Sequence, residues 1–321
     1  MTISIEDTEP TVGPNMLRRL VAAWPKRATI RTDMTQVVGP GPYQHDLLDY
    51  PADLLPFAGH PDFLAATEEQ RRLVNTLAWL AYNERVIAAE EYVANPTFEK
   101  LAHGVFPGLD RFEAKEAVQQ SHVDEVWHTY MHMLAMQRTR EARGLTAEPD
   151  TYTQPVTNRR LYARAAQASE QWERDLLYLL WTAVGEISIN KFLDLVAGDQ
   201  TIEPMHALIA RLHARDEAAH GPVLFEVMKS VFGHLNKPQK ALLAQVLPDA
   251  IVAFGAEDYD IWRDILKFAG IRKVEQIIED SRSVPGSDLI VTDFTPVQRL
   301  VRELEIEHLV DFDFTTNQKT K

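Results

Sequence analysis

Apolar residues recur at every third or fourth position through four long stretches of the chain, the spacing of helices that bury one face. The first stretch begins after Thr67 and runs to about Ala94. Thr67 is a favourable N-cap, and Gln70 three residues later completes the pattern of a capping box. Asn95–Pro96 then predicts the end of this helix, because proline removes a backbone donor.

Three more long helices are predicted by the same spacing, and a glycine marks the end of each. They span about residues 111–143, 170–197 and 202–232, which Gly144, Gly198 and Gly233 follow. Pro204 falls in the first turn of the last helix, where proline is tolerated. A fifth helix is expected from about Pro238, with Asn236 as its cap.

The two ends of the chain have a different pattern. Residues 1–66 are rich in proline and glycine and predict an irregular arm. Residues 258–321 predict shorter helices, with SDLIVTDF (287–294) as the one strand-like run. This pattern favours an all-α fold, a ferritin-like four-helix bundle with additional helices and one long crossover connection. We expect a single domain made of the arm, a helical core (67–257) and a C-terminal helical cap (258–321).

Composition and charge limit the chemistry. The 321 residues include 47 acidic residues against 33 Lys and Arg, a net charge of −14 that argues against nucleic acid or anionic membranes as partners. There is no cysteine, which excludes disulfides, thiolate metal sites and cysteine nucleophiles. The N-terminus lacks a signal-peptide pattern, so we expect a cytoplasmic protein. The apolar run at 176–196 contains Glu186 and favours a buried helix over a membrane span.

The pattern Glu-x-x-His occurs four times, and only its place on a helix separates a metal site from chance. The four pairs are Glu125/His128, Glu203/His206, Glu217/His220 and Glu305/His308. The second pair lies at a helix start and the fourth in a charged segment, so neither is expected to bind metal. The first and third lie in mid-helix on the apolar face, where both side chains of a pair can reach one ion.

Each of the other two long helices offers one carboxylate at the apolar face, Glu90 in the first and Glu186 in the third. His213, four residues before Glu217, adds a further nitrogen on the same face. A glutamate from each of two helices and Glu-x-x-His from each of the other two is the donor set of a di-metal bundle. Four carboxylates neutralise two divalent ions, and carboxylate with imidazole suits iron or manganese.

An aspartate precedes the glutamate in both pairs, Asp124 and Asp216. Each points about 100° away from its glutamate. We predict that each accepts a hydrogen bond from the outer nitrogen of the metal-binding histidine on the other helix and fixes its tautomer. His122 and His132 share the metal-facing stripe, and we interpret them as core or supporting histidines.

At these residues the sequence resembles the p-aminobenzoate N-oxygenases, di-iron arylamine oxygenases of antibiotic biosynthesis. The resemblance covers about residues 17–314 and rests on YNERVIAAEEYVANP, VDEVWHTYMHML, VGEISIN and LHARDEAAHG. It implies two iron ions, O₂ as co-substrate, an external electron donor, and oxidation of an aromatic amine through hydroxylamine and nitroso stages to a nitro group by a peroxo-di-iron species. It also implies a homodimer, and seven ligands: Glu90, Glu125, His128, Glu186, His213, Glu217 and His220.

Candidate substrate contacts are Tyr82, Arg85 and Asn190. Arg85 is either part of a surface ion pair or an anchor for a carboxylated substrate such as p-aminobenzoate. Three rival functions remain open at this point. They are iron storage or detoxification, a radical-generating oxidase with Tyr130 beside the metals, and a metal-free helical interaction module.

Overall fold

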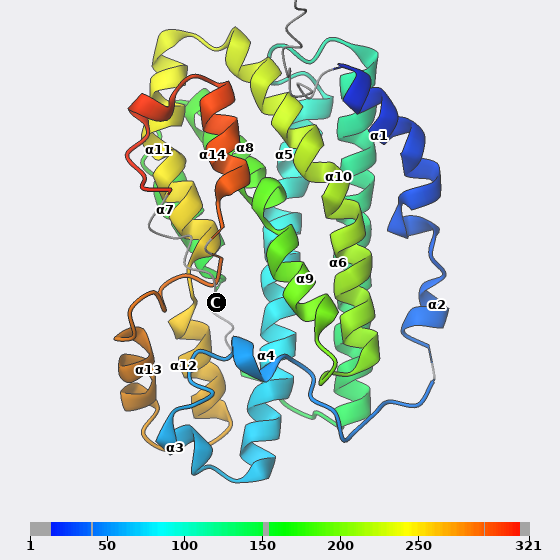
Figure 1. The fold of residues 1–321 in the computed structure, drawn as a ribbon, viewed down its shortest axis with the longest axis vertical. Helices are drawn as coiled ribbons and strands as arrows, with labels where there is room; N and C mark the ends of the chain where they lie inside the picture. Colours follow the sequence, from blue (N-terminus) through cyan, green and yellow to red (C-terminus); the bar gives the residue numbers. More distant parts are fainter. Residues whose placement is uncertain (1–13, 40, 150–153, 292, 315–321) are drawn as a thin grey trace, which may run out of the picture.

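Four helical rods run side by side along the long axis of the molecule (Figure 1). The computed structural model describes residues 14–39, 41–149, 154–291 and 293–314. Within these ranges the chain forms helices and two isolated β-bridges but no strand, so the all-α prediction is confirmed. The rods are α4 (Glu68–Ala89) with α5 (Asn95–Ala102), α6 (Phe112–Arg143), α8 (Gln171–Ser188) with α9 (Asn190–Gly198), and α10 (Pro204–His234).

The first rod starts as predicted but does not stop at Asn95–Pro96. Thr67 and Gln70 form the expected capping box. After Ala89 the chain widens into η3, a π-helical segment (Glu90–Ala94), and then continues as α5. The backbone N–H of Asn95 bonds the carbonyl of Glu90, five residues back. Pro96 thus occupies the first turn of a new helix, where its missing N–H removes no bond.

The other rods match the prediction except for one bend. Gly144 ends α6 in the left-handed conformation with φ of 63°, which glycine adopts without strain. The predicted third helix is instead two, because the chain bends by 41° at Ile189 between α8 and α9. The bend falls in the Ile–Ser–Ile–Asn run 187–190, whose residue types have weak helix propensity. Among the described residues no single helix is long and apolar enough to cross a membrane.

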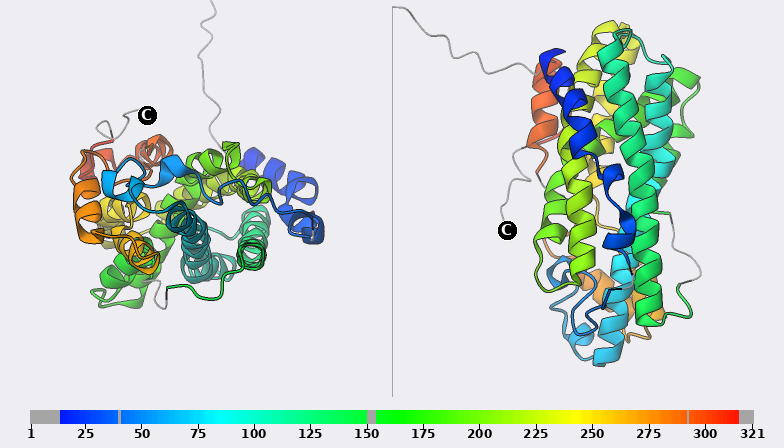
Figure 2. Two further views of the ribbon diagram at one scale, coloured as in Figure 1. Left: turned by 90° about the horizontal axis from the view of Figure 1, so that it is seen from below. Right: turned by 90° about the vertical axis from the view of Figure 1, so that its right-hand side faces the viewer.

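The N-terminal arm contains more helix than predicted in residues 14–39 and 41–66, while residues 1–13 and 40 lie outside the described ranges. Residues 14–27 form α1 (Pro14–Arg27), which lies along the outer side of α6 and α10 (Figures 1 and 2). The prediction of an irregular arm is wrong there, because Leu17, Leu20 and Val21 follow helical spacing and pack on the core. Two single turns follow, α2 (Met34–Val37) and α3 (Pro61–Leu64), besides the 3-10 turns η1 (Thr29–Arg31) and η2 (Ala52–Leu54).

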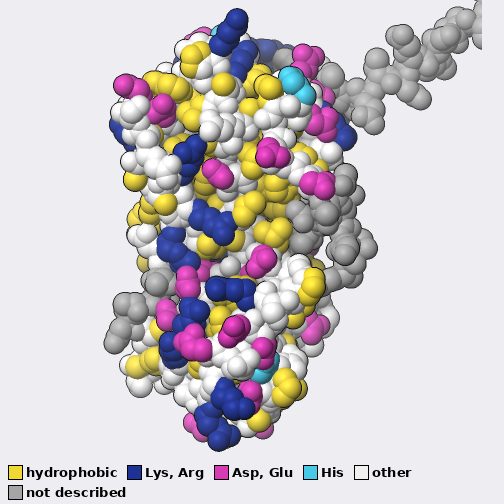
Figure 3. Space-filling view, turned by 90° about the vertical axis from the view of Figure 1, so that its left-hand side faces the viewer, with side chains coloured by type: hydrophobic (Ala, Val, Ile, Leu, Met, Phe, Trp, Pro, Cys, Tyr) yellow, Lys and Arg dark blue, Asp and Glu magenta, His cyan; other side chains and the backbone are white. Residues whose placement is uncertain are grey.

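Shorter helices cover one side and the lower end of the bundle. They are α7 (Val156–Ala165), α11 (Lys237–Gly255), α12 (Tyr259–Phe268), α13 (Val274–Arg282), α14 (Thr295–Glu303) and the 3-10 turn η4 (Glu307–Leu309). Asn236 caps α11 as predicted. The strand-like run 287–294 forms no strand within its described residues, and Leu289 makes only an isolated bridge to Ala256. Acidic and basic side chains are interspersed over the face formed by this side (Figure 3).

Candidate metal centre

Seven buried acidic and histidine side chains meet in the middle of the four rods. They form two groups, in each of which one donor atom per residue lies within 4.8 Å of the others. We name them the three-donor set (Glu90, His128 and His213) and the four-donor set (Glu125, Glu186, Glu217 and His220). The seven residues are the ones that the sequence singled out. They come from the π segment η3, α6, α8 and α10.

Local backbone features bring these rods close together. Glu90 opens the π segment, a rare helical form that is frequently found at functional sites. Gly221 lies on α10 opposite α8, and a Cβ there would be 3.2 Å from the carbonyl oxygen of Glu186. A side chain at this position would hold α8 and α10 apart. The glycine therefore sets the spacing between Glu186 and the donors of α10.

Two of the carboxylates reach both sets, and two reach only one. Glu217 Oε1 is 3.6 Å from His128 Nδ1 and 3.0 Å from His220 Nδ1. Glu125 Oε1 is 3.9 Å and 2.7 Å from the same two nitrogens. Of these two histidines, Glu90 lies near His128 alone, at 3.6 Å, and Glu186 lies near His220 alone, at 3.4 Å. The arrangement has the form of two bridging and two terminal carboxylates.

The two aspartates make the cross-helix contacts that the sequence predicts. His128 Nε2 on α6 lies 3.2 Å from Asp216 Oδ2 on α10, and His220 Nε2 on α10 lies 3.2 Å from Asp124 Oδ2 on α6. An ionised aspartate only accepts, so each histidine carries its proton on Nε2. Burial opposes protonation of these two rings, but the surrounding carboxylates raise the pKa of both, so a cation must displace the proton on Nδ1. The freed Nδ1 lone pair then faces the carboxylates, as metal coordination requires.

Helix α1 and the turn η1 that follows it add an outer layer behind these aspartates. Trp24 Nε1 donates to Asp124 at 3.0 Å, and the backbone N–H of Thr29 donates to Asp216 at 3.0 Å. The Arg27 guanidinium lies between the two carboxylates, 3.0 Å from Asp216 and 3.6 Å from Asp124. One cation therefore helps to orient both aspartates. The apolar spacing at 17–24 indicates the helix, but nothing in the sequence indicates that Trp24 and Arg27 contact the two aspartates.

A hydrogen-bonded chain fixes the tautomer of His213 as well. Asn83 Nδ2 donates to the carbonyl of Trp79 at 2.6 Å, which leaves Asn83 Oδ1 to accept from His132 Nδ1, also at 2.6 Å. His132 Nε2 must then accept from His213 Nδ1, 3.0 Å away. The remaining lone pair, on His213 Nε2, faces Glu90 at 3.2 Å and Glu217 at 3.3 Å. His132 thus supports a donor, in line with its predicted place.

His122 lies apart from the donors. Its half-buried ring stacks on Phe98 with 6.3 Å between ring centres, and burial lowers its pKa. The two rejected Glu-x-x-His pairs are also elsewhere. His206 bonds Thr139 and the Asp49 carbonyl, and residues 305 and 308 are both exposed.

The charges of the centre are unbalanced without a cation. Burial and then the charge of Glu217 raise the pKa of Glu125, while burial and then Glu125 raise the pKa of Glu186. Burial opposes ionisation of Glu217 as well, but the charges of His220 and His213 and their hydrogen bonds together outweigh it and lower the pKa of Glu217. Buried donor atoms of the centre also have no hydrogen-bond partner: Glu90 Oε1, Glu125 Oε1, His128 Nδ1, Glu186 Oε2 and Glu217 Oε2. Divalent cations would satisfy both the charge and these atoms.

The three candidate substrate contacts do not share one place. Arg85 donates to the backbone carbonyls of Phe254 at 2.8 Å and Ala256 at 3.1 Å, so the predicted surface ion pair is not formed. Arg85 and Tyr82 line one cavity of about 50 Å³ with Phe192. No metal donor lines this cavity, but the Tyr82 ring meets the edge of His132, which bonds the donor His213. Burial and the nearby charges of Tyr50 and Glu90 raise the pKa of Tyr82. Asn190 is half-buried at the start of α9 and does not line the cavity.

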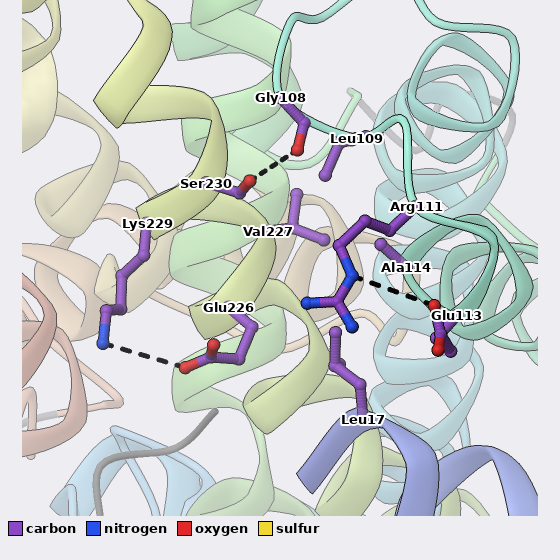
Figure 4. A pocket seen from close by; sticks show the side chains of 10 residues that line it. All are labelled: Leu17, Gly108, Leu109, Arg111, Glu113, Ala114, Glu226, Val227, Lys229 and Ser230. Atoms are coloured by element: carbon purple, nitrogen blue, oxygen red, sulfur yellow. Dashed lines mark hydrogen bonds and ion pairs between the residues drawn. The ribbon is translucent and has the colours of Figure 1, made fainter. Parts of the chain in front are cut away.

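A larger cavity of about 310 Å³ lies between α1, α10 and the segment that leads into α6 (Figure 4). Charged side chains surround it, with Arg111 paired to Glu113 and Lys229 paired to Glu226. None of the seven donors lines it.

Comparison with known proteins agrees with this geometry. The family model described as p-aminobenzoate N-oxygenase AurF matches residues 11–305. A 4-aminobenzoate N-oxygenase of Streptomyces thioluteus is 45% identical over 308 residues, which cover 95% of this chain and 91% of that protein. The resemblance predicted from the four motifs is confirmed. The chain belongs to the p-aminobenzoate N-oxygenase AurF family.

Proposed function

We propose that the protein is an O₂-dependent di-iron oxygenase that oxidises the nitrogen of an aromatic amine, in antibiotic biosynthesis. The observation that carries the proposal is the pair of adjoining donor sets, whose buried atoms lack partners and whose histidine tautomers are fixed toward the centre. Family membership supports the reaction type, because the Streptomyces thioluteus relative is a 4-aminobenzoate N-oxygenase.

The chain would hold the two irons with all seven donors. Glu125 and Glu217 would bridge, Glu90 and Glu186 would each bind one iron, and the histidines would complete the two sites. The irons, when bound and reduced, supply the activation of O₂. The protein contributes fixed ligand geometry, neutral imidazoles held by aspartate or histidine partners, and a surrounding shell that excludes water.

The amine would reach the centre from the cavity beside Tyr82. Its volume of about 50 Å³ holds a water molecule rather than an aromatic ring, so side chains such as Phe192 must move aside when substrate binds. Arg85 would then attract a carboxylate at the far end of the substrate, which favours p-aminobenzoate over an uncharged arylamine. Asn190, half-buried at the bend after α8, lies outside this cavity, so its amide would contact the substrate only after the movement that widens the cavity.

Further parts of the proposal rest on the family. An external donor would supply electrons to the irons, and the protein would act as a homodimer. The sequence pattern, rather than the family, is the basis for proposing a cytoplasmic protein with residues 67–257 as the core of a single domain. The exposed apolar residues Val126, Tyr130 and Met133 on one face of α6 support a surface for a second copy. A radical-generating oxidase is less well supported, since Tyr130 is 47% exposed and packs on Trp127.

The test combines metal analysis with turnover. Protein loaded with ferrous iron and given an electron donor and O₂ should hold two irons per chain and convert p-aminobenzoate to hydroxylamine, nitroso or nitro products. Glu186→Gln should lose iron and activity, whereas Glu305→Gln, in an exposed pair of the same pattern, should keep both. Arg85→Met should raise the KM for p-aminobenzoate and leave the KM for aniline unchanged. Iron-loaded protein that oxidises neither amine would overturn the proposal.

A further inference from the structure

Aromatic rings form a continuous line from the metal centre to the surface of the protein. The line starts at His213, whose Nδ1 donates to His132 Nε2 at 3.0 Å. The ring of Tyr82 meets the edge of His132 with 6.1 Å between centres, and it stacks on Trp79 at 5.4 Å. Every ring up to this point is buried. Close aromatic rings of this kind let an electron pass inward in short steps.

The line continues outward from Trp79. His206 lies flat on the Trp79 indole, with 4.0 Å between ring centres and 12° between planes. Tyr43 meets His206 at 5.9 Å and is partly exposed. Tyr43 also lines an open cavity of about 170 Å³ on the surface, together with Arg138. The outermost ring is therefore accessible to small reductants in the solvent.

The two outer redox-active rings have proton acceptors, and the inner one does not. Trp79 Nε1 donates to Thr139 Oγ1 at 3.1 Å, and Thr139 Oγ1 lies 2.9 Å from His206 Nε2. The Tyr43 hydroxyl donates to Asp49 Oδ1 at 2.5 Å. The Tyr82 hydroxyl, by contrast, is buried without a partner. Oxidation of a phenol or an indole is easiest when its proton can leave at the same time.

We propose that Tyr82, Trp79 and Tyr43 form a protective route that delivers one electron to the metal centre when O₂ has reacted there and no amine is bound. This inference rests on the proposed function. Trp79 gives an electron across Tyr82 to the unspent oxidant at the metal pair, while the indole proton shifts toward Thr139 and His206. Tyr43 then reduces Trp79, which regains its proton, and the phenolic proton of Tyr43 passes to Asp49. The net change is one electron gained at the metal pair and a tyrosyl radical at the surface.

The direction of electron transfer follows from which side chain can hold a stable radical. Tyr82 has nowhere to send its proton, so it serves as a bridge. Tyr43 has a carboxylate acceptor that Arg143 holds in place with two contacts of 2.9 Å. A radical on Tyr43 lies beyond the buried ligands, so their imidazoles are spared. Trp127 and Tyr130 form the competing exit, with 5.3 Å between their rings, but the Trp127 indole N–H is buried without an acceptor.

The experiment exposes reduced, iron-loaded protein to repeated O₂ without amine and in the presence of a nitroso spin trap. Peptide mass spectrometry then locates the adducts, and rapid-freeze electron paramagnetic resonance identifies the radical. Wild type should carry its adduct on Tyr43 and show a tyrosyl signal. Tyr43→Phe should remove that adduct and give an indolyl signal from Trp79. Tyr130→Phe, which changes an exposed tyrosine off the line, should behave as wild type.

Trp79→Phe removes the indole that passes the electron from Tyr43 toward Tyr82. Trp79 is buried, so if this substitution prevents folding, Tyr43→Phe still tests the route. Trp79→Phe should lose the Tyr43 adduct and gain oxidised histidine at His132 or His213. Adding p-aminobenzoate should suppress the Tyr43 adduct in wild type. Adducts confined to Trp127 and Tyr130, or none on Tyr43 in protein that still oxidises the amine, would overturn the inference alone. Protein that neither holds iron nor oxidises the amine would overturn the proposed function and the inference with it.

Discussion

Removing Asp216 should weaken one metal site and leave the other nearly intact. Asp216 accepts from His128 Nε2 at 3.2 Å, from the Thr29 backbone N–H at 3.0 Å and from Arg27 at 3.0 Å. In Asp216→Ala the Arg27 side chain, which is 20% exposed, can turn toward water. The N–H groups of Thr29 and His128 are buried and cannot do so. His128 would then lose the contact that fixes its tautomer.

The size of the effect follows from these contacts. Two buried donors without partners cost about 1–3 kcal/mol each, which should appear as lower stability of the metal-free protein. Loss of a partner behind a metal-binding histidine typically weakens the metal by roughly 10- to 100-fold. We expect this loss at the iron bound by His128 only. Asp124→Ala is the matched control, because it should weaken the iron bound by His220 instead.

The assay is a titration of ferrous iron in competition with a chelator. Two sites of different affinity appear in it as two separate binding steps. Wild type should bind two irons tightly, and each aspartate variant should bind one tightly and one weakly. Urea unfolding of the metal-free proteins gives the stability change separately. Two variants that retain both irons with the affinity of wild type, or that lose both irons equally, would refute the role of the aspartates as selective partners.

Three further predictions concern the same centre. Gly221→Ala should push α10 away from the Glu186 carbonyl, lowering stability by roughly 1–3 kcal/mol in urea unfolding and reducing bound iron; unchanged values would refute the spacing role. Asn83→Leu removes the acceptor of His132, so the tautomers of His132 and His213 are no longer fixed. The affinity for iron should fall by about tenfold in chelator competition, and an unaltered affinity would refute this role. Metal binding must displace the protons that the raised pKa values keep on Glu125 and Glu186. Iron should therefore bind more tightly at about pH 8 than at about pH 6, and an affinity independent of pH would contradict this charge distribution.

Much of the fold was predictable from local chemistry. The capping residues Thr67 and Asn236 and the terminal Gly144 act within one helix turn, so the sequence around them is sufficient. The π segment at Glu90 was not predictable, since a wide turn is stabilised by the packing of η3 against α6 and α8 rather than by its own residues. The bend at Ile189 likewise falls within a continuous apolar pattern.

The donors of the centre were predictable because an acid on the apolar face of a helix must be paired, protonated or bound to a metal. The contacts of Asp124 and Asp216 followed from the angle between neighbouring residues on a helix. The layer formed by Arg27 was not predictable, because a surface arginine on a short helix looks like any solvated charge. The same is true of Arg85, whose carbonyl partners at the end of α11 are about 170 residues away along the chain.

The most direct test of the account is an X-ray structure of the iron-loaded protein with anomalous data at the iron edge. We predict two iron peaks per chain roughly 3.5–4 Å apart, one bound by His128 and the other by His220, with Glu125 and Glu217 between them. A single peak, or iron bound outside these seven side chains, would contradict a di-iron centre held by these helices.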